Sequence, residues 1–114
     1  MTSTKKLTLL QQRDLARYRH RLELYEAQRR RLRQALAELV PGRRVIVFGS
    51  LTKPGVFNDR SDIDVALEKE SLRMDTWRLM SELMDRLGRR VDVVVLNKCR
   101  FRERILREGE VWTV

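Results

Sequence analysis

The residues of this sequence that could do chemistry together are two aspartates and a glycine–serine pair. Gly49-Ser50 is followed, after a spacer of eleven residues, by Asp62-Ile63-Asp64. Successive side chains of a strand point to opposite faces, so Asp62 and Asp64 would project together while Ile63 enters the core. Their Cα atoms would lie about 7 Å apart, and two such carboxylates repel each other unless a cation such as Mg²⁺ lies between them. The spacing therefore predicts a metal site.

Asp92 is the third candidate ligand. It interrupts the otherwise apolar run 91–95, and a carboxylate in a buried strand is costly without a counter-charge. If this run lies beside the strand with the other two aspartates, Asp92 completes a site of three carboxylates and could accept the proton of an attacking hydroxyl. The alternative is an ion pair with Arg89 or Arg90 at the start of the strand. The nearby aspartates favour the site.

Gly49 and Ser50 are candidates for binding phosphate. Glycine permits close approach of the backbone, and the amides at Ser50 and in the turn after it would point outward at a helix start, where an anion is favoured. The Ser50 hydroxyl could donate one more hydrogen bond. The alternative is an ordinary turn between a strand and a helix. The two motifs in this order, with a later strand that carries its own aspartate, favour the phosphate and metal site.

The elements that must position these residues alternate along the chain, which predicts an α/β or α+β fold with two layers. We expect strands at 44–48, 62–67, 91–96 and 111–114, and helices at 8–39, 72–87 and 100–108. A small mixed sheet would carry helices on its surface. We divide the chain into an N-terminal extension, 1–42, which is mostly one long helix, and a domain at 43–114.

The helix at 72–87 carries two further expectations. Ser71 would cap its N-terminus, and Gly88 would end it. Trp77 belongs to the apolar stripe of this helix and is expected, like Trp112, to be wholly or partly buried.

The N-terminal helix is long for so small a protein. Thr8 and Gln11 form a capping box at its start. An apolar stripe with a three–four spacing runs through 15–39 and is broken only by Arg29. The C-terminal half of the stripe would pack on the domain, and the N-terminal half would reach a partner. A homodimer through this helix is one such expectation.

Composition limits the class of protein. The chain has 114 residues, a length that favours one domain. Its net charge of +9 favours an anionic partner such as a nucleotide, RNA or an acidic protein. The alternative is that the charge only keeps the surface soluble. Cys99 is the only cysteine, which excludes a disulfide within the chain. No apolar run is long enough to cross a membrane and none follows the basic N-terminus as in a signal peptide, so we expect a cytoplasmic protein.

These motifs resemble those of a known family. Residues 44–110 resemble the minimal nucleotidyltransferase (MNT) domain of the DNA polymerase β superfamily, with Gly49-Ser50 and the segment Ser61-Asp62-Ile63-Asp64-Val65 in the places of its two motifs. The segment 91–94 resembles the strand with its third carboxylate. The spacer is one residue longer than is usual there and contains Pro54.

The resemblance implies a polymerase-β-like fold and a reaction. Two Mg²⁺ ions would hold the triphosphate of ATP, with Asp62 and Asp64 bridging both ions and Asp92 on the catalytic one. Gly49, Ser50 and Ser61 would contact the nucleotide. An acceptor hydroxyl would attack the α-phosphorus and release pyrophosphate.

Small stand-alone members of this superfamily resemble the antitoxins of HEPN/MNT toxin–antitoxin pairs. The implied function is transfer of AMP from ATP to a tyrosine of a partner HEPN-type toxin. Two other interpretations remain open. The protein could be an antitoxin that acts by binding alone, or it could bind nucleic acid or modify RNA ends through its basic helix.

Overall fold

The N-terminal helix is the longest element of the structure, which is a computed structural model and describes residues 6–71 and 73–114. This helix, α1, extends from Leu9 to Leu39. Thr8 and Gln11 form the expected capping box: the side chain of each accepts a hydrogen bond from the backbone amide of the other. Two amide groups that the first turn would leave free are thereby satisfied.

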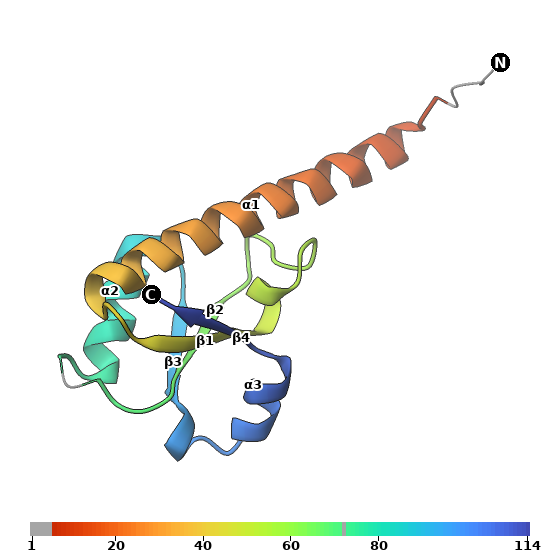
Figure 1. Cartoon of the computed structure of the whole chain (residues 1–114). Coiled ribbons are helices and arrows are strands. Elements are labelled where there is room, and N and C mark those ends of the chain that lie inside the picture. The colour runs from red at the N-terminus through yellow and green to blue at the C-terminus, as the bar shows by residue number, and fades with distance from the viewer. Residues whose placement is uncertain (1–5, 72) are drawn as a thin grey trace.

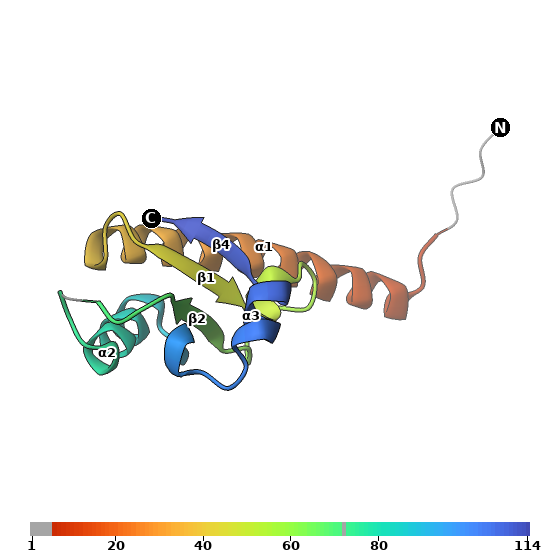
Figure 2. The same cartoon turned by 60° about the horizontal axis from the view of Figure 1, so that its bottom comes forward.

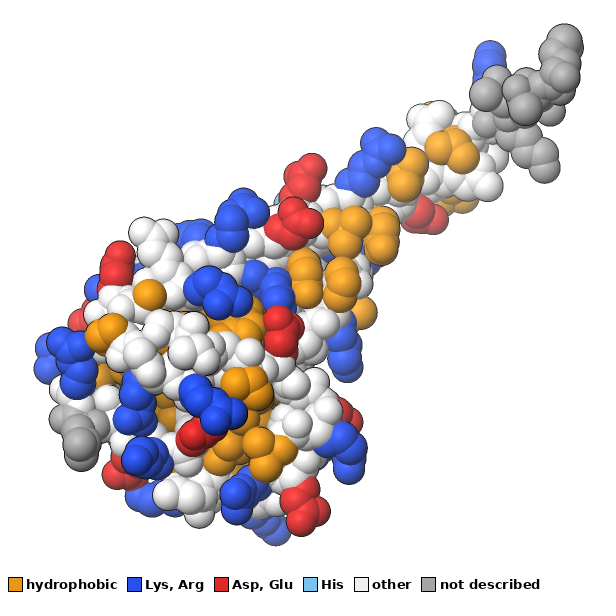
Figure 3. All heavy atoms as spheres, in the orientation of Figure 1, with side chains coloured by type: hydrophobic (Ala, Val, Ile, Leu, Met, Phe, Trp, Pro, Cys, Tyr) orange, Lys and Arg blue, Asp and Glu red, His pale blue; other side chains and the backbone are white. Residues whose placement is uncertain are grey.

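The buried residues of α1 all lie in its C-terminal part. Leu32, Leu36 and Leu39 are buried, whereas every residue from 9 to 20 is exposed. Figure 1 shows the exposed part projecting past the sheet, and Figure 3 shows apolar side chains along it between charged ones. The C-terminal half therefore packs as expected, and the N-terminal half is uncovered. Among the described residues, no helix is both long and apolar enough to cross a membrane.

Four strands form one mixed sheet in the order β3-β2-β1-β4. The strands are β1 Arg44–Phe48, β2 Ile63–Leu67, β3 Val91–Val95 and β4 Glu110–Thr113. β1 is antiparallel to both β2 and β4, whereas β2 and β3 are parallel and are joined by a crossover that contains α2, Thr76–Leu87. A parallel pair requires such a long connection, because the chain must return to the end of the sheet at which the first strand began. The predicted small mixed sheet is confirmed.

Helices cover both faces of this sheet. α1 and α2 pack on one face, where Leu36 and Leu83 lie in the same core as Val47 and Val65. α3, Arg102–Glu108, packs on the other face, where Ile105 belongs to a smaller cluster with Ile46 and Ala66. Figure 2 shows α1 lying along the sheet and α3 near the end of β1. The α+β architecture expected from the sequence is confirmed.

The start of α2 differs from the expectation. The helix begins at Thr76, and its N-cap is Asp75, whose carboxylate accepts a hydrogen bond from the amide of Arg78. Ser71 is therefore not the cap, and its hydroxyl accepts a hydrogen bond from the amide of Arg73 instead. An aspartate caps a helix about as well as a serine, so the later residue satisfies the first turn and the helix starts there. Residue 72, where we expected the helix to begin, lies outside the described residues.

The placement of Trp77 is also corrected. Its side chain is 76% exposed and does not belong to the core. The buried stripe of α2 consists of Leu79, Leu83 and Leu87. Trp77 precedes Leu79 by two residues, which is about 200° around a helix, so it points away from that stripe. Trp112, by contrast, is buried as expected.

Candidate active site

Asp64 and Asp92 are register partners on the parallel strands β2 and β3. Ile63 and Val65 lie in the core beneath α1 and α2, and strand residues alternate between faces, so Asp64 and its partner both point to the opposite face, the one that carries α3. Asp62 precedes the first residue of β2, one position outside the strand in which we expected it. The structure therefore brings the second and third candidate carboxylates together on one face of the sheet.

Gly49 lies directly against Asp64. It begins the 3₁₀ turn Gly49–Thr52 and has a φ of +73°, a conformation that glycine adopts at little cost. A Cβ atom at this position would lie 2.5 Å from Oδ2 of Asp64. A side chain at residue 49 would therefore collide with the carboxylate. The glycine serves both the turn and the close approach of the turn to Asp64.

The carboxylates repel one another. The pKa of Asp64 is raised to about 6, first because burial removes water from the charged form and then because Asp92 and Asp62 are negative. The positive charge of Arg90 opposes the shift. The Nε atom of Arg90 lies 3.5 Å from Oδ1 of Asp92 and 4.0 Å from Oδ2 of Asp62. The ion pair that we considered as the alternative role of Asp92 is thus present, but with a mostly exposed arginine.

The chemistry of this group fits a hard divalent cation. Within residues 6–71 and 73–114, no three His, Cys, Asp or Glu side chains are already arranged to hold a metal ion. However, a cationic group already lies between Asp62 and Asp92, and the charge on Asp64 lacks sufficient compensation. Carboxylate oxygens are the ligands that Mg²⁺ prefers. Arg90 is exposed and attached through a flexible stem, so it could move aside for a metal ion.

Ser50 and Ser61 lie at the two ends of the spacer. Ser50 is the second residue of the 3₁₀ turn, and its carbonyl accepts a hydrogen bond from the amide of Lys53 at 3.0 Å. The Ser61 hydroxyl accepts a hydrogen bond from the amide of Asn58, also at 3.0 Å, and so stabilises the loop before Asp62. The structure does not bring either serine into the cavity described below.

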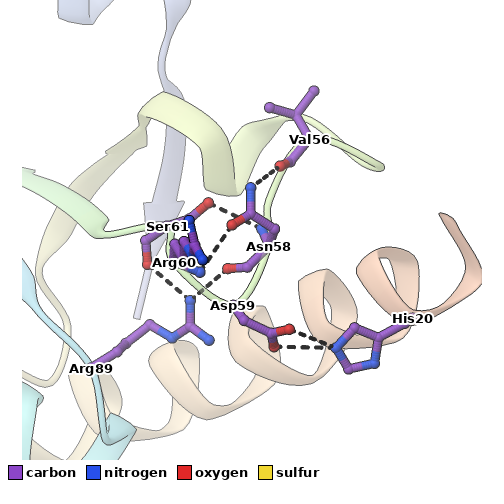
Figure 4. A network of polar contacts seen from close by, with 7 residues as sticks. All are labelled: His20, Val56, Asn58, Asp59, Arg60, Ser61 and Arg89. Carbon is purple, nitrogen blue, oxygen red and sulfur yellow. Dashed lines mark hydrogen bonds and ion pairs between the residues drawn. The ribbon is translucent and has the colours of Figure 1, made fainter. Parts of the chain in front are cut away.

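Two arginines hold the backbone of the spacer. Arg29 of α1 donates a hydrogen bond of 3.0 Å to the carbonyl of Leu51. Arg89, which precedes β3, donates to the carbonyls of Asn58 and Ser61 at 3.0 and 2.9 Å, as Figure 4 shows. The sequence showed Arg29 only as a break in an apolar stripe, and nothing in the sequence indicated these partners.

The projecting part of α1 also contacts the spacer. His20 Nε2 lies 3.1 Å from Oδ1 of Asp59 (Figure 4). The ring of Tyr18 lies so close to Gly55 that a Cβ atom there would be 2.6 Å from it. The loop is therefore supported by residues that lie well before the sheet in the sequence.

A cavity of about 760 Å³ opens beside the carboxylates. Gly49, Asp64 and Asp92 line it, whereas Ser50, Ser61 and Asp62 do not. Arg90, considered from the sequence only as an ion-pair partner of Asp92, also lines the cavity, as do Lys53 and Arg104, which the sequence did not indicate. Lys53 could have been noticed, because it is a cation three residues after a candidate phosphate-binding turn. Arg104 comes from a segment whose proximity only the fold determines.

A four-stranded mixed sheet with a glycine turn and two facing carboxylates defines a nucleotidyltransferase-like domain. A family model described as polymerase beta, nucleotidyltransferase, matches residues 30–112, and the chain belongs to this family. The superfamily that the motifs indicated is thereby confirmed. The match begins inside α1, and the division of the chain at residue 42 remains a prediction. No curated protein is significantly similar in sequence.

Solved structures share the fold. One is a toxin–antitoxin with AMP-PNP, with 23% identity and a TM-score of 0.58 over 75% of this chain and 73% of that one. Another is the toxin–antitoxin MntA–HepT, with 21% identity and a TM-score of 0.54 over 78% and 73% of the two chains. A third is a mutant of such a toxin–antitoxin complex, with 22% identity and a TM-score of 0.55 over 75% of this chain and 72% of that one. At these identities the similarity concerns the fold.

Proposed function

We propose that the protein is a Mg²⁺-dependent nucleotidyltransferase that transfers AMP from ATP to a tyrosine hydroxyl of a HEPN-type toxin, and that it acts as the antitoxin. The family supports nucleotidyl transfer. The similar structures are toxin–antitoxin complexes, one of them with AMP-PNP, which supports this choice of partner and nucleotide. The observation that carries the proposal is the register pair of Asp64 and Asp92 against Gly49.

In this proposal, the roles follow the position of each residue. Asp62, Asp64 and Asp92 are the ligands of two Mg²⁺ ions, which would neutralise charge on the triphosphate and on the leaving group. The turn that starts at Gly49 and Ser50 offers backbone amides to the phosphates. Ser61 acts on the loop just before the first ligand. The contribution of the protein is mainly positioning and charge neutralisation, as is usual for phosphoryl chemistry.

The proposed reaction forms one bond to phosphorus and breaks another. The acceptor oxygen forms a bond to the α-phosphorus, the bond from the α-phosphorus to the bridging oxygen breaks, and pyrophosphate leaves. The proton of the acceptor hydroxyl passes to Asp92, which lies on an exposed edge strand and can return it to water. The products are an adenylylated hydroxyl and pyrophosphate.

A transfer assay tests this proposal. The protein is incubated with ATP labelled at the α-phosphate, Mg²⁺ and a HEPN-type toxin as the acceptor. We expect label on the partner, and we expect its loss in Asp64→Asn and Asp92→Asn but not in Asp85→Asn, which removes an exposed carboxylate of α2. No label from the wild-type protein, while the partner is still neutralised, would refute the enzymatic function.

One observation favours an antitoxin that acts by binding alone. Arg90 pairs with Asp92 and approaches Asp62, and a guanidinium in this position competes with a metal ion. The same assay separates the two functions, because binding without catalysis would neutralise the toxin equally well in Asp64→Asn.

A binding site for nucleic acid has one local basis. Arg13, Arg17 and Arg21 line a hollow between α1 and the loop at Asn58. Contacts to phosphates release counterions, so affinity for RNA would fall steeply as salt is raised. A flat response to salt would exclude this function.

A further inference from the structure

Two large aromatic side chains are exposed at the wall of the cavity beside the carboxylates. Trp77, in the first turn of α2, is 76% exposed, and Phe101, just before α3, is 62% exposed. Both line this cavity together with Asp64 and Asp92. Single exposed apolar residues are common on proteins, but exposed aromatic side chains gathered at one cavity are typical of a binding site.

The topology explains how helices on opposite faces of the sheet reach one cavity. β3 is the edge strand beside β2, so nothing separates the α3 side from α2 at that edge. Met80 of α2 and Ile105 of α3 also line the cavity. The cavity therefore extends from the carboxylates around the edge of the sheet to an apolar wall.

This wall suits one part of a nucleotide. We propose that Trp77 and Phe101 form the base-binding platform of the protein, on which the base of the nucleoside triphosphate stacks; this inference rests on the proposed function. A phosphate chain held at Gly49 and the carboxylates leaves ribose and base to occupy the rest of the same cavity. The volume of about 760 Å³ lies within the range of roughly 300–1,000 Å³ typical of small-molecule sites.

The polar groups around the platform fit the same occupant. Arg104, Glu108 and Cys99 line the cavity, and a base offers both donors and acceptors at its edge. Stacking on an aromatic face tolerates any base, because each has a π-face. The platform therefore supplies affinity for any base, and the polar contacts to the edge of the base determine which base binds best.

Tryptophan fluorescence tests the platform directly. The chain has two tryptophans, and Trp112 is buried, so the difference between the spectra of wild type and Trp77→Phe isolates Trp77. We expect Mg²⁺ with AMP-PNP to quench this difference signal, and Mg²⁺ with inorganic tripolyphosphate to leave it unchanged. In titrations, Trp77→Ala should weaken AMP-PNP by about 5- to 100-fold while tripolyphosphate binds as before. Trp77→Phe should retain most of the affinity.

A matched control is Leu9→Ala, which removes an exposed apolar side chain, 85% exposed, from the far end of α1; it should bind both ligands like wild type. Equal affinity of Trp77→Ala and wild type for AMP-PNP would overturn the platform and leave the transferase intact. The platform would also be overturned, with the transferase left intact, if Trp77→Ala bound AMP-PNP like wild type and lost only the transfer to a protein acceptor. Absence of binding of both ligands to the wild type would overturn the platform and the proposed function together.

Discussion

A Cβ atom on Gly49 would lie 2.5 Å from the Oδ2 atom of Asp64, so any other residue at position 49 would force this carboxylate out of its place. The first residue of the proposed phosphate-binding turn therefore lies directly against the central carboxylate of the proposed metal site. Neighbouring strands produce this contact, because Phe48 of β1 is the register partner of Asp64 on β2. The backbone positions of the turn and of Asp64 are thus set by the pairing of β1 with β2.

Gly49→Ala should therefore abolish binding of Mg²⁺ and nucleotide. The residue also has positive φ, so we expect a loss of about 1–2 kcal/mol in the free energy of unfolding. Gly42→Ala is the matched control, because Gly42 has a φ of +76° but no atom within 4 Å of the added Cβ. Both variants should lose stability in denaturant titrations, and only Gly49→Ala should lose binding. Normal binding by Gly49→Ala would contradict the site.

Asp64→Asn should stabilise the protein when no metal ion is present. The pKa of Asp64 is raised, so its charged form is unfavourable in the folded state, and the amide removes that repulsion. We expect a gain of about 1 kcal/mol at pH 7.5 in EDTA, after allowance for the solvent that reaches this partly exposed group. Mg²⁺ should then raise the stability of the wild type but not of the variant. A destabilised Asp64→Asn in EDTA would show that the carboxylate is well compensated.

The contacts of Arg89 and His20 with the spacer should differ in importance. Arg89 donates to two backbone carbonyls and lies 4.6 Å from the ring centre of Phe57, so Arg89→Ala should cost about 1–2 kcal/mol. The His20–Asp59 pair is exposed on both sides, so His20→Ala should change stability by less than about 0.5 kcal/mol. Thermal unfolding of the two variants measures both effects, and a larger loss in His20→Ala would reverse this ranking.

The pair of Arg29 and Glu110 should make stability depend on pH in acid. The hydrogen bond from Arg29 holds the pKa of Glu110 below its ordinary value. A carboxylate with a lowered folded-state pKa contributes fully above its unfolded value, and the contribution disappears as pH falls through the folded pKa. Glu110→Gln should therefore cost about 0.5–1 kcal/mol at pH 7 and much less at pH 3. Denaturation at the two pH values tests this, and a difference that does not change with pH would exclude the pair as its cause.

Local patterns in the sequence were sufficient for much of the site. Alternation along a strand predicted that Ile63 is buried and that Asp64 leaves the core, and the cap at Thr8 needed only Gln11 three residues later. The α+β fold followed from the order of the elements. These features depend on neighbours in sequence, which is why they could be recognised without the fold.

Other features depend on residues far apart in the chain. The register that pairs Asp64 with Asp92 arises from the crossover through α2. The role of Arg29 requires the turn at Leu51 to lie beside α1. The buried stripe of α2 runs through Leu79, Leu83 and Leu87 and leaves Trp77 outside, and which stripe is buried depends on the elements that pack against the helix. The cavity that Trp77 lines forms only where the turn at Gly49, the strands β2 and β3 and the helices α2 and α3 meet.

The most direct test of the central claim is a calorimetric titration of the wild-type protein with AMP-PNP, in the presence and absence of Mg²⁺. The account predicts binding that requires Mg²⁺ and that is lost in Asp64→Asn and Asp92→Asn but kept in Asp85→Asn. Binding of AMP-PNP that is equal with and without Mg²⁺, or that survives in both site variants, would contradict a metal–nucleotide site at these carboxylates.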